Sequence, residues 1–222
     1  MAIQPFEWSV VIVGRWNRAI LTPAGIAKRV FKLEDQKQVP VLVPLDGISP
    51  YLVKHPEYEI IVCTDEKSLQ IRLEKFDYDT LAQAMVFGSN AIMFLPETPL
   101  VAVGVNVNFE IPNVTPPLAS LLAGDIDKSL STVNYNVISR SVVRSFVFGE
   151  GQLNTTIIIE NGSFKIMFNF HRSSTNIDPE KIRIDLENWL KTPKEQIHNT
   201  VDNILQALQI ELEDSENDSQ QQ

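Results

Sequence analysis

The stretch that decides the fold is VAVGVNVNFEI at residues 101–111. Its odd positions are all apolar, and they alternate with Ala102, Gly104, Asn106, Asn108 and Glu110. Successive side chains of a strand point to opposite faces of a sheet, so a period of two predicts a half-buried strand. We therefore expect residues 101–111 to lie inside an antiparallel sheet.

The region before this strand alternates between β-rich and helical patterns. Thr22 before Pro23 is typical of a helix start, and Pro40 and Pro44 bracket an apolar triplet that suits a sheet edge. The helix near Phe87 is apolar on most sides, so we expect it to be buried or to lie at an interface. The predicted elements are a strand at 8–13, a helix at 23–32, an edge strand at 41–43, a loop at 46–56, a hairpin at 58–63 and 69–73, and a helix at 80–94.

The region after it repeats the order of strands followed by helices. Asn161-Gly162 lies between β-branched and aromatic runs, which predicts a type I′ hairpin turn. Thr192 and Glu195 have the spacing of a capping box at the start of the last helix. The predicted elements are strands at 135–148, 153–160 and 164–170, a helix from 178, and a helix from 192 to about 210.

These patterns predict an α+β fold made of two antiparallel meander-plus-helix halves, with the helices packed on the sheet. The first half, residues 1–111, is ββαβ-like, and the second half, residues 133–210, is a β-hairpin followed by two helices. A junction rich in proline and glycine at 112–132 separates them. Residues 211–222 form an acidic tail that we expect to be disordered.

Composition excludes several classes of protein. The chain has 222 residues, a net charge of −9 and one cysteine, Cys63, so neither a disulfide framework nor a cysteine-rich zinc site is expected. No apolar run reaches the roughly 18 residues that a membrane helix needs, and no signal peptide is visible. We expect a soluble, cytoplasmic protein without a cofactor.

The charge is unevenly distributed. Residues 211–222 hold five acids and no base, which leaves 23 acids against 19 bases, or −4, for the rest of the chain. The acidic balance disfavours a wholly electrostatic nucleic-acid binder, but a body near neutrality permits a local basic patch.

Catalytic and metal motifs are missing from the sequence. HExxH, CxxC and GxSxG do not occur, and His55, His171 and His198 lack a histidine partner at metal-binding spacing. His198 with Asp202 suits either a weak metal pair or a solvated helix face. We predict no catalytic and no metal-binding residue, and we interpret Cys63 as a buried structural thiol.

The first candidate site is a basic cluster around an aromatic residue. Arg15, Trp16 and Arg18 follow the first strand, and Lys28 and Arg29 lie on the next helix. An exposed indole between arginines can stack a base while the cations hold phosphate. In the alternative, Trp16 packs under the helix and the bases are solvated.

The second candidate site is Arg140 with Arg144. Both share a strand face with Val142 and Phe146, and arginine among apolar side chains is typical of an interface or a buried ion pair. Anion binding is the other interpretation.

Two stretches carry a resemblance to a known family. VVIVGRWNRAI at 10–20 and LPETPLVAVGVN at 95–106 resemble a sporadically distributed group of uncharacterised bacterial α+β proteins that lack an assigned activity. The resemblance implies an α+β fold over most of 8–210 and no catalytic residues. Sporadic genes of this kind often belong to mobile-element or defence islands, so it also implies a place in such a system.

Three hypotheses follow. The first is a non-enzymatic assembly or adaptor protein that acts through protein–protein contacts, with a protein partner or a homo-oligomer. The second is a nucleic-acid-binding component that uses Arg15, Trp16 and Arg18. The third is an enzyme whose site is assembled from scattered residues such as His171 and Arg172.

Overall fold

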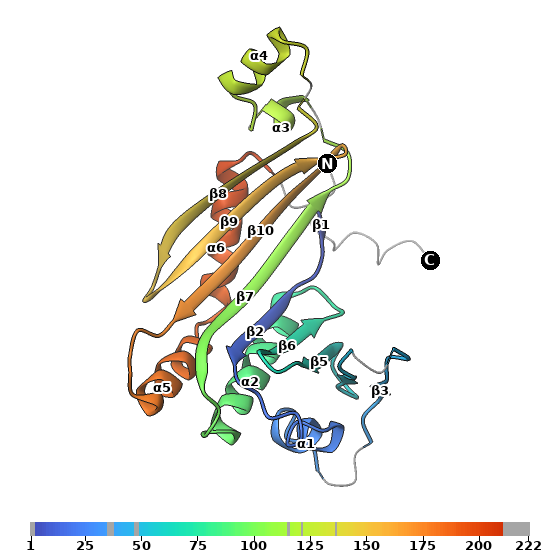
Figure 1. Ribbon diagram of the computed structural model, residues 1–222, viewed down its shortest axis with the longest axis vertical. Coiled ribbons are helices and arrows are strands. Elements are labelled where there is room, and N and C mark those ends of the chain that lie inside the picture. Colours follow the sequence, from blue (N-terminus) through green and yellow to red (C-terminus); the bar gives the residue numbers. More distant parts are fainter. Residues whose placement is uncertain are drawn as a thin grey trace, which may run out of the picture.

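The computed structural model describes residues 3–34, 38–46, 49–114, 116–120, 122–135 and 137–210, and structural statements below concern these residues. Within them one sheet of ten strands runs through the molecule, with helices packed on one of its faces (Figure 1). The predicted α+β class is confirmed. The acidic tail predicted at 211–222 lies outside the described residues.

Every strand pairing in the sheet is antiparallel. The order across the sheet is β3-β4-β5-β6-β2-β7-β10-β9-β8, and β1 pairs with β7 beyond this path. The strands are β1 (Gln4–Pro5), β2 (Ser9–Gly14), β3 (Val41–Leu42), β4 (Leu52–Lys54), β5 (Ile60–Thr64), β6 (Ser68–Leu73), β7 (Leu100–Ile111), β8 (Ser139–Phe148), β9 (Gly151–Glu160) and β10 (Ser163–Ser173).

The alternating stretch that predicted a strand is β7, and it lies at the middle of the sheet. It pairs with β2 on one side and with β10 on the other, where Val105 lies opposite Phe170. The two predicted meander-plus-helix halves therefore share one continuous sheet. The boundaries at 112–132 stay a prediction, and the described part of that segment contains α3 (Pro116–Ser120) and α4 (Asp125–Thr132).

The main core lies between the sheet and the helices. Phe164, Ile166, Phe168 and Phe170 are fully buried on one face of β10, as their alternation predicts. Helix α2 (Tyr78–Phe94) packs on β2 and β6, and α5 (Pro179–Trp189) packs on β7 and β10. The remaining helices are α1 (Pro23–Arg29) and α6 (Lys194–Ala207). None of the described helices is long and apolar enough to span a membrane.

Several local predictions are confirmed. Thr22 accepts a hydrogen bond from the Gly25 amide at the start of α1, and β3 lies at the edge of the sheet. Asn161 and Gly162 both have positive φ, 50° and 78°, which a type I′ turn requires.

Two local predictions are wrong. The segment expected as a loop at 46–56 contains the short strand β4, whose period-two pattern is too brief to detect. The capping box at Thr192 does not form, because Pro193 is the N-cap of α6 and the Thr192 hydroxyl instead donates to the Trp189 carbonyl.

Candidate protein interaction site

Strand β8 forms one edge of the sheet. Its only strand neighbour among the described residues is β9, so its other side is unpaired (Figure 1). In an antiparallel strand, alternate residues turn their N–H and C=O groups to one side. β8 therefore presents a row of hydrogen-bonding groups to solvent along its ten residues.

The turn that precedes β9 holds this edge in place. Gly149 has a φ of 55° and begins a two-residue loop, a position that favours glycine in a type II′ turn. A Cβ on Gly151 would lie 2.5 Å from the His171 carbonyl oxygen and 2.8 Å from Trp189 Nε1. The hairpin therefore docks closely against β10 and α5, while β8 stays at the outside.

Large apolar side chains of β8 are exposed on both faces of the sheet. Val143 is 60% exposed and Val147 is 90% exposed, and both lie on the face without helices. Phe146, on the other face, is 45% exposed, and Tyr135 and Ile138 just before the strand are also exposed. We call these five residues the edge patch. Exposed apolar side chains gathered along an unpaired edge are typical of an interaction site.

The structure separates the two arginines of this strand. Arg140 Nε lies 2.5 Å from Asp127 Oδ2 on α4, and both side chains are about three-quarters covered. Arg140 thus forms the ion pair that one interpretation predicted, whereas Arg144 is exposed. The structure leaves one exposed cation beside Phe146 at the edge.

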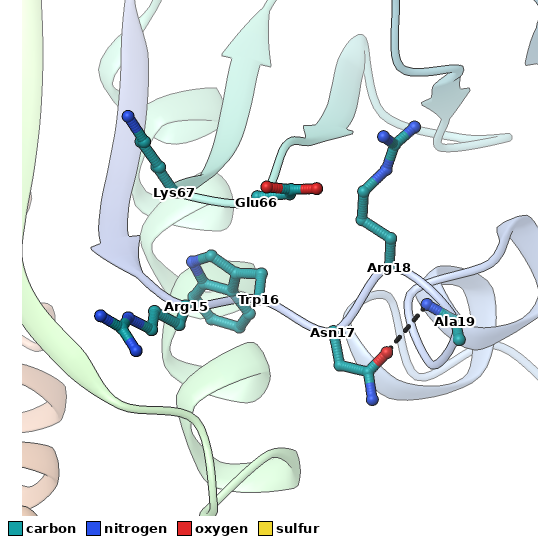
Figure 2. Close-up of a pocket in the computed structure, with 7 residues that line it drawn as sticks. All are labelled: Arg15, Trp16, Asn17, Arg18, Ala19, Glu66 and Lys67. Atoms are coloured by element: carbon teal, nitrogen blue, oxygen red, sulfur yellow. Dashed lines mark hydrogen bonds between the residues drawn. The ribbon is translucent and has the colours of Figure 1, made fainter. Parts of the chain in front are cut away.

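The basic cluster near the first strand lines a separate hollow. It has a volume of about 550 Å³ and is lined by Arg15, Trp16, Asn17, Arg18, Ala19, Glu66 and Lys67. Figure 2 shows that Arg15 and Arg18 point in different directions from the backbone on either side of Trp16. Lys28 and Arg29 lie on α1 and are not among the lining residues.

The indole of Trp16 is not available for stacking. It is 4% exposed, and its Nε1 donates to the Ile12 carbonyl oxygen at 3.1 Å. A base cannot reach the face of a buried ring, so the structure favours the alternative in which Trp16 packs in the core. The cations around it remain at the surface.

The residues suggested for a scattered catalytic site point to opposite faces. His171 and Arg172 are neighbours on β10, so their side chains lie on different sides of the sheet. Arg172 forms a two-pronged ion pair with Asp185, with Nη2 2.8 Å from Oδ1 and Nε 3.2 Å from Oδ2. This geometry joins β10 to α5 and does not bring His171 and Arg172 into one pocket.

The histidine and aspartate predicted on the last helix do meet. His198 Nε2 lies 3.1 Å from Asp202 Oδ2, and the ring of Tyr78 stacks on the imidazole with centroids 4.0 Å apart. Burial raises the pKa of the Tyr78 phenol, and the charge of Asp202 raises it further. In the described part of the chain, no group of three His, Cys, Asp or Glu side chains is arranged to hold a metal ion.

A row of polar side chains crosses the helix-free face and was missed from the sequence. The register aligns Ser9, Asn106, Asn169, Asn154 and Ser145 across five strands. Asn169 Nδ2 donates to Asn106 Oδ1 at 2.7 Å, and Asn106 Nδ2 donates to the Ser9 hydroxyl at 3.0 Å. The polar positions of each strand were visible, but their alignment depends on pairings between distant segments.

Comparisons with known proteins add little. No family model matches the chain, and no curated protein matches it. Among solved structures it is similar to Methanococcus jannaschii TBP, with a TM-score of 0.31 and 9% identity over 94% of this chain and 99% of that one.

Proposed function

We propose that this protein is a non-enzymatic assembly or adaptor protein that acts through protein–protein contacts at the β8 edge. The observation that carries the proposal is the unpaired ten-residue edge with Val143 and Val147 exposed beside it. Backbone groups at such an edge give affinity to an added strand, and the flanking side chains give specificity.

The charge distribution at the edge supports a protein partner. Residues 139–148 contain two arginines and no acid, and Arg140 already pairs with Asp127. The remaining surface combines exposed valines with Phe146 and Arg144, and aromatic residues and arginine are enriched at protein interfaces. The place of the protein in a bacterial defence or mobile-element system belongs to the same proposal and rests on the sequence resemblance alone.

The test uses two charge-matched double variants. Val143→Lys with Val147→Lys alters the edge, and Val86→Lys with Val101→Lys alters two other exposed valines. Sedimentation velocity measures self-association, and purification from the host measures bound partners. We expect the edge variant to lose the complex and the control to keep it. A monomer that retains no partner, or a complex that survives the edge variant, would contradict the proposal.

The hollow at Arg15 and Arg18 supports a second function, the binding of a nucleic-acid backbone. Arg15, Arg18 and Lys67 supply three cations to one surface depression, although Glu66 lies among them. Contacts to phosphate need no stacking and weaken steeply with salt. Arg15→Ala with Arg18→Ala should weaken binding to single-stranded DNA at low salt, and a wild-type protein that shows no binding there would exclude this function.

A further inference from the structure

We infer that the occupant of the β8 edge is a second copy of this chain, whose β8 pairs antiparallel with the first about a two-fold axis at Val143. The inference rests on the proposed function and names its partner. It follows from the direction of the backbone groups, the positions of the two arginines and the length of the strand.

The odd-numbered residues of β8 point their N–H and C=O groups away from β9, toward the free side of the strand. The two-residue loop closes on the pair of Phe148 and Gly151, which is the hydrogen-bonded pair in such a hairpin. Hydrogen-bonded pairs alternate along an antiparallel ladder, so even-numbered residues turn to β9. Ser141, Val143 and Ser145 then present their N–H and C=O groups to an incoming strand.

The faces of the sheet restrict the possible registers. A two-fold axis perpendicular to the sheet keeps the helix-free faces of both copies on the same side, so odd residues lie opposite odd residues. The axis must therefore lie level with one residue of β8, which faces its own copy across the axis. Axes at Val143 and Arg144 pair nine residues of the strand, whereas axes at Val142 and Ser145 pair seven.

The arginines decide among these registers, because like charges directly opposite each other destabilise a sheet. An axis at Val142 places Arg140 opposite Arg144, and an axis at Arg144 places that residue opposite itself. An axis at Val143 places Arg140 opposite Phe146 and Arg144 opposite Val142. This register alone separates the cations while it pairs the strand from Ser139 to Val147.

The same register covers the exposed apolar side chains. Val143, at 60% exposure, meets its own copy on the axis. Ile138, which is 85% exposed, lies opposite Phe148 of the second copy. Phe146, at 45% exposure, lies opposite Arg140 of the second copy, whose guanidinium is already paired with Asp127. Four of the five edge-patch residues, Ile138, Val143, Phe146 and Val147, thus fall within the paired segment or next to it.

The opposite edge of the sheet also exposes apolar side chains, Leu42, Val43 and Leu45, but it offers far fewer backbone groups to a partner. That edge is β3, which has two residues, Val41–Leu42, and pairs only through Val41 with Val53 and Leu42 with Leu52. A strand of this length supplies few backbone groups to a partner. The pairing of β8 with itself therefore closes the assembly as a dimer and does not extend it into a filament.

Engineered cysteines test the register directly. Val143→Cys should form a covalent dimer under mild oxidation, because its Cα atoms lie opposite each other within disulfide range. Ser141→Cys and Ser145→Cys should each stay uncrosslinked alone, yet give a heterodimer when co-expressed with different tags. The wild type is the control, since Cys63 is buried and burial raises the pKa of its thiol.

The association state completes the test. Light scattering should give twice the 25.1 kDa mass of the chain for the wild type and the mass of a monomer for Val143→Pro. Proline removes the N–H that Val143 turns toward the partner, and the pairing of β8 with β9 does not use that N–H. A dimer that crosslinks at other positions but not at Val143 would overturn the inference.

A strict monomer also overturns it, and the outcome of the partner capture then separates the two proposals. If the monomer binds another protein through the edge, the adaptor proposal survives without self-pairing. If it binds nothing, both proposals fail.

Discussion

Truncation of Trp16 distinguishes a core residue from a nucleic-acid contact. Trp16 follows the end of β2 by two residues, and its indole is 4% exposed and donates its N–H to the Ile12 carbonyl oxygen at 3.1 Å. Trp16→Ala removes the whole ring from a packed site and removes the indole donor to that carbonyl. If the ring were a stacking platform, the same change would leave the fold intact.

The expected cost follows from burial. Removal of a buried tryptophan side chain costs about 3–5 kcal/mol of unfolding free energy. For a domain of this size, such a loss lowers Tm by roughly 6–20 °C. Trp16→Phe keeps most of the ring and loses the hydrogen bond, so its cost should be about 1–2 kcal/mol. Arg15→Ala, at the surface beside it, should stay within roughly 0.5 kcal/mol.

Urea unfolding followed by circular dichroism measures these differences without relying on the fluorescence of the altered residue. The slope with urea should be the same in all variants, so that shifts in midpoint report stability. A cost below about 1 kcal/mol for Trp16→Ala would refute the burial argument. Loss of DNA binding in Trp16→Phe at unchanged stability would also refute it and restore the stacking role.

Three further changes test other contacts. Tyr78→Phe should be neutral or stabilising by about 1 kcal/mol, because the buried hydroxyl has no hydrogen-bond partner among the described residues. The pKa of Tyr78 is raised in the folded state, so above about pH 10 the unfolded state loses this proton first and wild-type stability should fall. Urea titrations at rising pH should show a weaker fall for Tyr78→Phe. Arg172→Met should cost about 2 kcal/mol in chemical denaturation because it leaves the Asp185 carboxylate without its cation, and Arg172→Met with Asp185→Leu should recover most of that loss. If the stability losses of the two single variants simply add in the double variant, the ion pair does not contribute. Gly151→Ala should cost about 1–3 kcal/mol in thermal unfolding because its Cβ meets the His171 carbonyl. Gly124→Ala, with nothing within 4 Å of its Cβ, should cost less than about 1 kcal/mol, from the weaker N-cap of α4 alone, and equal costs would contradict the packing argument.

Local patterns predicted the elements whose signals are self-contained. The alternation in β7 and β10, the Asn161-Gly162 turn and the cap at Thr22 each depend on a few neighbouring residues. These features arise from the intrinsic periodicity and turn chemistry of the chain, so they can be recognised without knowledge of any partner segment.

Features that depend on distant pairing could not be predicted. The register that aligns Asn106 with Asn169 joins segments more than 60 residues apart, and the edge position of β8 follows from which strands fill the other places. Trp16 is a similar case, because its local sequence is compatible with both stacking and burial. Only the neighbours of a side chain decide between those two roles.

The unequal protection of the two sheet edges bears on the proposed dimer. Natural proteins shield exposed edges with short strands, charges, prolines or covering elements. The β3 edge follows this rule, since it is two residues long and has Pro40 and Pro44 on its flanks. The β8 edge is less protected, because it is ten residues long, has no proline and carries exposed Val143 and Val147 on the helix-free face, with Arg144 as its exposed charge. A long apolar edge of this kind promotes uncontrolled aggregation unless another strand covers it. Pairing with one second copy covers the edge and leaves no further edge to extend. Replacement of Val143 by proline should therefore leave a monomer that is no less soluble than the dimer. Variants that open the dimer without blocking the edge should aggregate.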